Sequence, residues 1–129
     1  MTTVSQKLTC PPIPGDTSTP HPSVAKRCRV ERNMLFSLLT HLHQLGFEVT
    51  GASDGEERHK CTTILQALSV VFSVDDSAVY VRRAGDAKGH TICVILGNDG
   101  WDAVSDYSVA PGFTEAMDAF NFDVWDDRT

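Results

Sequence analysis

Five leucines between residues 35 and 45 recur at the spacing of a single helical face. Their positions are i, i+3, i+4, i+7 and i+10, which places all five side chains on one side of an α-helix. Gly46 follows at the position where a left-handed residue often ends a helix. The pattern predicts a helix from about Glu31, and its apolar face requires a partner surface. The five residues are Leu35, Leu38, Leu39, Leu42 and Leu45. Pro22-Ser23 is an alternative, earlier signal for a helix start.

Beyond this helix, the chain switches to the two-residue alternation that is typical of strands. Residues 47–50 and 78–83 alternate apolar and polar side chains, and residues 91–96 form a continuous apolar run that predicts a central strand. Residues 56–61 are polar and charged, which suits a short edge strand. An Asn-Asp-Gly turn then leads into residues 101–107, whose alternation predicts the last strand.

Two further helices are predicted. Thr62 or Thr63 is the expected N-cap of the second helix, because its hydroxyl can accept a backbone N–H. The apolar face of that helix is formed by Ile64, Leu65, Leu68, Val71 and Phe72. A third amphipathic helix is predicted to run to the end of the chain, on the spacing of Phe113, Met117, Phe120 and Val124.

The order of these elements is α-β-β-α-β-β-β-α. It predicts the α+β class, with an antiparallel sheet of four to five strands and three helices mainly on one face. A domain of about 98 residues can bury one core without disulfide bonds. We therefore expect residues 31–129 to form a single domain.

The first 22 residues contain five of the six prolines and few large apolar side chains. Such a segment buries too little surface to offset the entropy lost on ordering. We expect residues 1–30 to form a flexible arm. The chain shows no apolar leader and no run of roughly 20 apolar residues, so a cytoplasmic protein with free cysteines and no membrane contact is expected.

The net charge of −6 is unevenly distributed. Residues 99–129 hold eight acidic side chains against Arg128 alone, whereas residues 1–33 hold five basic side chains against two acidic ones. An acidic body repels nucleic-acid phosphates and attracts a basic protein surface. The expected partner is therefore a protein with a basic surface, and nucleic-acid binding by the folded domain is disfavoured. The oligomeric state is left open.

The acidic, aromatic C-terminal region is the leading candidate for a contact surface. Phe122 and Trp125 are three residues apart, so on a helix they share one side. Aromatic side chains with a polar rim are common anchors of protein interfaces. The hypothesis is a non-enzymatic protein-binding module, in a sharper form an inhibitor that mimics phosphates with its carboxylates. The candidate residues are Asp102, Asp106, Asp118, Phe122, Asp123, Trp125, Asp126 and Asp127.

Two alternatives come from different classes. Asp99, Asp102 and Asp106 are hard oxygen ligands near one hairpin and would suit Mg²⁺ or Ca²⁺ in a metal-dependent hydrolase or nuclease. The competing interpretation of these residues is one turn residue and two solvated carboxylates. The second alternative is nucleic-acid binding through the basic segment 26–32, whose cations are Lys26, Arg27, Arg29 and Arg32.

Motifs for catalysis and cofactor binding are not found. The four cysteines lack Cys-x-x-Cys spacing, His41 and His43 point to different sides of their helix, and Cys93 sits between apolar strand residues. Neither a Gly-x-Ser-x-Gly elbow nor a glycine-rich nucleotide loop is present. No catalytic residue and no cofactor are therefore predicted.

The segment CVILGNDGWDAVSDYS (residues 93–108) resembles a stretch shared by small uncharacterised proteins of bacterial plasmids, phages and integrated elements. The segments TILQAL (63–68) and DDSAVY (75–80) are similar to theirs as well. The resemblance covers about residues 34–125. It implies a bacterial or phage cytosolic setting and an accessory role, and it transfers no functional residue.

Overall fold

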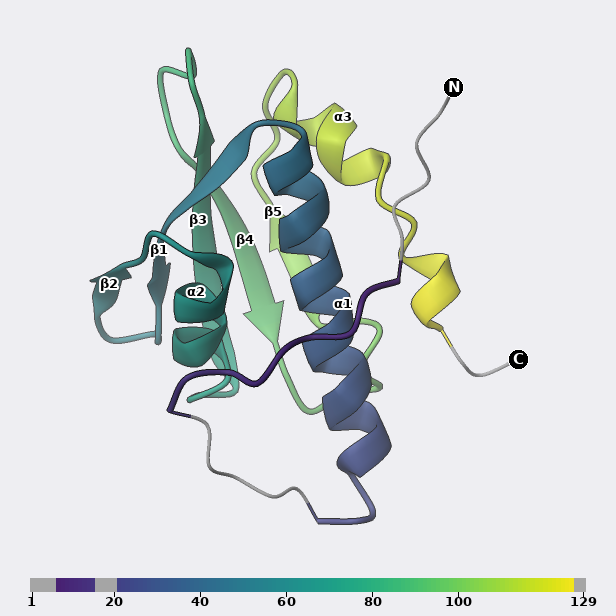
Figure 1. Cartoon of the computed structure of the whole chain (residues 1–129). Helices are drawn as coiled ribbons and strands as arrows, with labels where there is room; N and C mark the ends of the chain where they lie inside the picture. The colour runs from purple at the N-terminus through teal and green to yellow at the C-terminus, as the bar shows by residue number, and fades with distance from the viewer. Residues whose placement is uncertain (1–6, 16–20, 127–129) are drawn as a thin grey trace.

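The computed structural model describes residues 7–15 and 21–126. Three α-helices and five strands follow the predicted order, which confirms the α+β class (Figure 1). The elements are α1 (Ala25–Gln44), β1 (Phe47–Ser53), β2 (Arg58–Lys60), α2 (Ile64–Val71), β3 (Asp76–Arg83), β4 (His90–Ile95), β5 (Val104–Tyr107), α3 (Phe113–Asp118) and the short 3-10 helix η1 (Asp123–Trp125).

The five strands form one antiparallel sheet in the order β2-β1-β3-β4-β5. Its longest pairings join β1 to β3 and β3 to β4, with Ala52 opposite Val79 and Val79 opposite Ile92. The register shifts by one residue in β1 between Val49 and Gly51. Such a bulge bends the strand and increases its twist. The polar segment 56–61 contributes the three-residue edge strand β2, as its composition indicated.

The core lies between one face of the sheet and helices α1 and α2 (Figure 1). Alternate residues of β3 and β4 point inward, as the two-residue period requires. The leucine face of α1 packs on them, except that Leu45 is exposed. Thr63 caps α2 by accepting the Gln66 N–H, while the Gln66 side chain accepts the Thr63 N–H. This reciprocal pair explains why α2 starts where the sequence indicated.

Helix α1 begins at Ala25, which is earlier than the predicted start near Glu31. Its first turns lack a strong apolar pattern, so periodicity alone missed them. Residues 7–15 cross α1 and continue toward α2 (Figure 1). The Leu8 N–H donates to Ser37 Oγ, the Cys10 N–H donates to Asn33 Oδ1, and Ile13 is buried in the core. Side-chain acceptors on the helices thus satisfy the backbone of a proline-rich segment that cannot pair in a sheet.

The prediction of one long C-terminal helix is wrong. Helix α3 ends at Asp118, and the chain continues through a separate turn, η1. The Asn121 side chain accepts the Asp123 N–H, a local bond that competes with helix continuation. The last strand, β5, is also shorter than the predicted range 101–107. Asp102 Oδ1 accepts the Asp99 N–H, which holds the preceding residues in a turn and leaves β5 to begin at Val104.

Candidate functional site

A hollow of about 250 Å³ lies between β5 and the chain that follows α3. Its walls are Trp101, Val104, Tyr107 and Phe122, and Asp102 contributes a carboxylate. Trp101 and Tyr107 come from the two ends of one strand-and-turn segment, and Phe122 reaches them from beyond α3. Three aromatic rings from distant parts of the chain therefore converge on one opening.

Two more carboxylates lie close to Tyr107, although neither forms part of the lining of this hollow. The Tyr107 hydroxyl donates to Asp118 Oδ1 over 3.3 Å, and Asp106 Oδ1 accepts the Tyr107 N–H. Burial raises the pKa of Tyr107, and the negative charges of Asp118 and Asp106 raise it further. We call the set Trp101, Asp102, Val104, Asp106, Tyr107, Asp118 and Phe122 the acidic hollow. Asp106 and Asp118 are exposed, so their charge faces solvent and any partner.

The proposed aromatic pair Phe122 and Trp125 does not share one side. Phe122 lines the acidic hollow and stacks edge-on against Phe120, with ring centroids 4.8 Å apart. Trp125 is only 5% exposed, and the Lys7 ammonium lies 4.7 Å from its ring centroid. The break after α3 separates the two rings. Trp125 is therefore a packing residue that leaves little of its ring to a partner.

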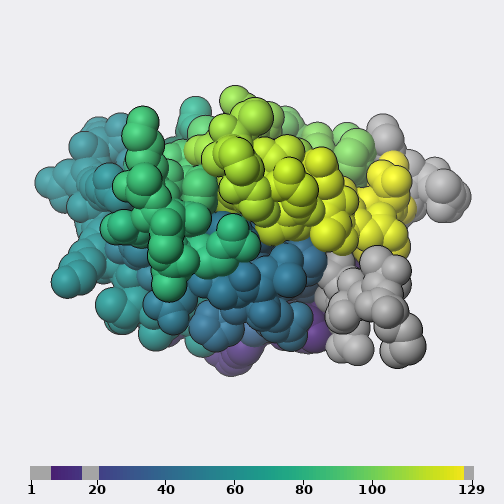
Figure 2. Space-filling model, turned by 90° about the horizontal axis from the view of Figure 1, so that it is seen from above, coloured from purple at the N-terminus to yellow at the C-terminus, as the bar shows by residue number. Residues whose placement is uncertain are grey.

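The remaining acidic candidates lie beyond the hollow. Asp123 is exposed and begins η1, and Asp126 is partly buried. Asp127 lies outside the described residues. Asp123 and Asp126 follow Phe122 along the chain, and we call this pair the acidic strip. Figure 2 shows this C-terminal segment, in yellow, at the surface beside the blue end of α1.

The three carboxylates of the metal hypothesis have separate local tasks. Asp102 closes a turn through the Asp99 N–H, and Asp106 accepts the N–H of its own neighbour. Among residues 7–15 and 21–126, no group of three or more His, Cys, Asp or Glu side chains is arranged to hold a metal ion. The geometry therefore gives the metal-dependent alternative no support.

The basic segment 26–32 forms the first turns of α1, and its cations divide into two pairs. Arg27 lies 3.7 Å from the buried carboxylate of Glu31, and Arg32 covers the ring of Phe72. Lys26 and Arg29 instead line a hollow of about 310 Å³ that Lys7, Asn33 and Trp125 help to form. Burial raises the pKa of Glu31, which also accepts the Gly97 N–H and so ties α1 to the turn before β5.

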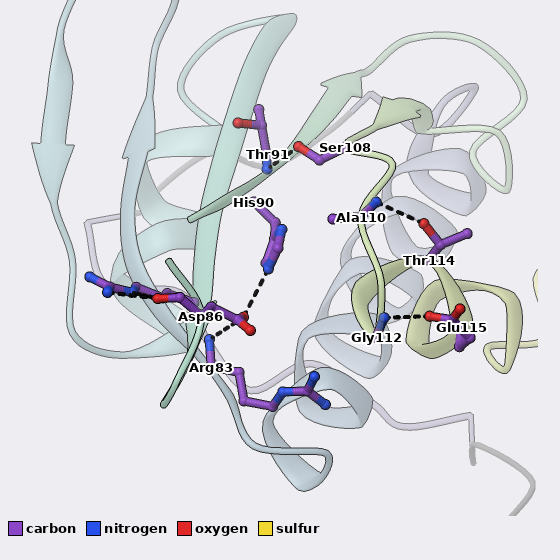
Figure 3. Close-up of polar contacts among 10 residues, drawn as sticks. Arg83, Asp86, His90, Thr91, Ser108, Ala110, Gly112, Thr114 and Glu115 are labelled. Carbon is purple, nitrogen blue, oxygen red and sulfur yellow. Dashed lines mark hydrogen bonds and ion pairs between the residues drawn. The ribbon is translucent and has the colours of Figure 1, made fainter. Parts of the chain in front are cut away.

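A second polar cluster supports α3 from the β3–β4 hairpin (Figure 3). His90 is buried and its Nε2 lies 2.9 Å from Asp86 Oδ2, which also accepts the Arg83 N–H. The hydrogen bond from His90 lowers the pKa of Asp86. The His90 ring stacks on Phe113 with centroids 4.5 Å apart and planes 5° apart. This pair of rings joins the sheet to the first residue of α3.

The start of α3 is shaped by a glycine beneath an arginine. Gly112 has φ +84°, and a Cβ there would meet the Arg83 guanidinium. The Gly112 N–H donates to Glu115 Oε2 over 2.5 Å, which caps the helix (Figure 3). Arg83 in turn lies over the Phe47 ring at 4.7 Å. Helix α3 therefore rests on the hairpin at a fixed position, and it carries Asp118 to Tyr107.

Sequence reasoning identified Asp102, Asp106, Asp118 and Phe122 but missed the two rings that make them a site. Trp101 and Tyr107 fall on the same side of the predicted strand, and this alternation was the available signal. Their convergence with Phe122 depends on the fold. The Asp86–His90 pair was missed as well, because the two side chains meet only when the turn between β3 and β4 has formed.

No family model matches the chain, and no curated protein or solved structure is significantly similar to it. The resemblance to proteins of plasmids and phages therefore stays a prediction. Within the described part of the chain, no helix is long and apolar enough to cross a membrane.

Proposed function

We propose that this chain is a non-enzymatic protein-binding module and that the acidic hollow is its contact surface. The observation that carries the proposal is the convergence of Trp101, Tyr107 and Phe122 beside three carboxylates. Aromatic rings attract a cation over their faces, and nearby carboxylates strengthen that attraction. A lysine or arginine side chain of a basic partner surface fits both features.

The acidic strip also sets the rate of encounter with such a partner. Long-range attraction between an acidic and a basic surface accelerates association and weakens as salt is added. The aromatic hollow then supplies the desolvated anchor that dominates affinity at protein interfaces. The two features predict a salt-dependent association rate and an affinity that depends on Phe122.

The test is an affinity pull-down from nuclease-treated bacterial lysate, read by mass spectrometry. The site variant carries Asp102→Asn, Asp106→Asn and Asp118→Asn; asparagine keeps an oxygen that can accept the turn and tyrosine hydrogen bonds. The control variant carries Glu56→Gln, Glu57→Gln and Asp76→Asn, which removes three exposed charges elsewhere.

The expected result is a stoichiometric protein partner that wild type and the control variant retain and the site variant loses. Phe122→Ala is expected to weaken the same association at least tenfold, as for an anchor residue. Equal recovery by the site and control variants would show that the acidic hollow is not the contact surface.

The sharper proposal is phosphate mimicry. Asp102, Asp106, Asp118, Asp123 and Asp126 of the described residues, together with Asp127, would occupy the phosphate positions of a nucleic-acid-binding partner. The module would then compete with DNA or RNA for that partner. Nucleic acid that binds the captured partner equally well in the presence of saturating module would rule mimicry out and leave simple protein binding in place.

A second candidate function is favoured by one observation. Lys7, Lys26 and Arg29 line the hollow beside Trp125, so their positive charges converge where an anion would be attracted. Nucleic-acid binding there predicts retention of single- or double-stranded DNA that is sensitive to salt and reduced by Lys26→Gln with Arg29→Gln. Retention that is unchanged by this pair of substitutions would count against it.

A further inference from the structure

Half of strand β1 has an uncovered edge. Strand β2 pairs with β1 only from Gly51 to Ser53, and the last main-chain bond along that side is from the Cys61 N–H to the Thr50 carbonyl oxygen. After Cys61 the chain leaves the sheet to form α2, as Figure 1 shows. No strand of the described residues lies beside Phe47–Val49 on this side.

The register identifies which main-chain groups face that edge. The Leu96 N–H donates to the Asp75 carbonyl oxygen, so Asp75 directs its groups toward β4. Along a strand, the main-chain groups of successive residues point to alternate sides. Arg82 is an odd number of positions after Asp75, so its N–H and C=O groups point toward β1. Arg82 lies opposite Glu48. Glu48 therefore bonds to β3, and its neighbours direct their N–H and C=O groups to the uncovered side.

An apolar pocket of about 460 Å³ adjoins this edge. Phe47 and Val49 of β1 and Ile64 and Leu65 of α2 supply its apolar lining. Polar groups are added by His43, Glu48, Thr62 and Thr63. The volume lies within the range of ligand pockets in proteins. An open strand edge beside an apolar pocket offers two kinds of contact at once: hydrogen bonds to a main chain and a place for a side chain.

We propose that this β1 groove binds an extended peptide segment of a partner protein. The segment adds as a short strand beside Phe47–Val49, in line with β2, and places one large aliphatic or aromatic side chain in the pocket. Strand addition at a sheet edge takes affinity from main-chain hydrogen bonds and specificity from side-chain pockets. The groove lies on the other side of β3 from the acidic hollow, so this assignment is independent of the proposed function.

The probe is a phage-displayed library of random linear nonapeptides, selected on the full chain. Selected peptides are synthesised and titrated into isotope-labelled protein, with backbone amide shifts as the readout. Leu65→Lys places a charge in the pocket. Val49→Pro removes an N–H that faces the open edge and leaves the β1–β3 ladder its bonds. Ile95→Lys, at an exposed aliphatic residue of β4, is the matched control.

We expect peptides with one large apolar residue in an extended pattern, and shifts of the Phe47 and Val49 amides. Leu65→Lys is expected to weaken binding at least tenfold, on the order of one buried aliphatic side chain, and Ile95→Lys to leave it unchanged. N-methylation of the peptide backbone at alternate positions is expected to abolish binding.

Three results would overturn the proposal. One is a library that yields no peptide retained by the wild-type chain. Another is a set of peptides that bind Leu65→Lys and wild type equally, which would place them elsewhere. The third is a shift of the Phe47 and Val49 amides with protein concentration alone, which would assign the groove to a second copy of this chain.

Discussion

Two hairpins of the sheet, β1–β2 and β3–β4, each contain an aspartate–histidine pair, but the two pairs stabilise different parts of the molecule. In the β1–β2 hairpin, Asp54 Oδ2 lies 3.0 Å from His59 Nε2, and the histidine side chain is 41% exposed. In the β3–β4 hairpin, Asp86 lies 2.9 Å from His90, whose side chain is 8% exposed. The spacing along the chain and the contact distance are similar, so burial is the main difference.

The exposed pair stabilises its own turn, whereas the buried pair contacts the start of helix α3. Asp54 accepts the Glu56 and Glu57 N–H groups as well as His59, and these bonds hold its pKa well below the usual range, the Glu57 bond contributing most. His90 stacks on Phe113 and so holds the start of α3. One hairpin is therefore stabilised by charge in a turn and the other by ring packing.

Removing the histidine ring of each pair is expected to show the largest difference in stability between the two hairpins. His90→Ala deletes the stack on Phe113 and leaves a cavity, so it should lower the free energy of unfolding by about 2–4 kcal/mol. His59→Ala, at an exposed site, should cost less than about 1 kcal/mol. Urea unfolding measures both. Equal losses would mean that the stack on Phe113 contributes nothing beyond the contact between histidine and aspartate.

A smaller difference is expected at two glycines. Gly112 and Gly55 both have positive φ, so alanine at either strains the backbone by roughly 1 kcal/mol. At Gly112 the added methyl group also displaces Arg83 from the Phe47 ring, whereas at Gly55 the nearest atom is at an ordinary 3.5 Å. Gly112→Ala should therefore lower the melting temperature further than Gly55→Ala. The reverse order would show that Arg83 does not hold α3.

The order of the two hairpins should be reversed in acid, where the stability contributed by each aspartate is lost: the larger effect is expected for Asp54 of the β1–β2 hairpin. Both aspartates have lowered pKa values, so the stability they confer is present above the unfolded pKa of about 3.9 and is lost as pH falls through the folded pKa. Asp54 accepts more hydrogen bonds, so Asp54→Asn should flatten the loss of stability below about pH 4 more than Asp86→Asn. Urea unfolding from pH 6 to pH 2 tests this, and a steeper dependence for Asp54→Asn would contradict it.

The smallest expected effect is a change in the Tyr107 pKa, which connects the β3–β4 hairpin to the acidic hollow through α3. Asp118 and Asp106 disfavour the phenolate of Tyr107, so Asp118→Asn should lower the Tyr107 pKa, and Asp123→Asn should not. His90→Ala should lower it too if α3 loses its position. Phenolate absorbance in a Tyr80→Phe background reports Tyr107 alone. A Tyr107 pKa unaffected by His90→Ala would show that α3 keeps its place without the stack.

The fold was largely predictable because its signals are local. The leucine face of α1, the alternation of β3 and the Thr63 cap each depend on residues within about two turns or one strand, and the structure confirms them. The break after α3 was not predictable from periodicity, since Phe120 and Val124 fit a helix that a single Asn121 side-chain bond helps to end.

The candidate site was only half predictable, because it is assembled over long distances. Carboxylates could be found from charge density alone, but the hollow requires that Phe122 return past α3 to Trp101. Trp125 illustrates the converse: its spacing from Phe122 predicts that the two rings share one side, whereas Trp125 is buried and the Lys7 ammonium lies over its ring. The spacing of residues along the chain predicts neither the convergence of Phe122 with Trp101 nor the burial of Trp125.

The contacts of residues 7–15 indicate how this segment is held in place. Leu8 and Cys10 bond to side chains of α1, and the Pro14 carbonyl oxygen accepts from Ser69 of α2. The segment therefore bridges the two helices through a few side-chain hydrogen bonds and has no strand ladder. Such a segment opens locally at little cost in free energy, so the Leu8 and Cys10 amides should exchange with deuterium long before those of β3. Shortening the chain to start at residue 31 would remove this bridge and the first turns of α1 together.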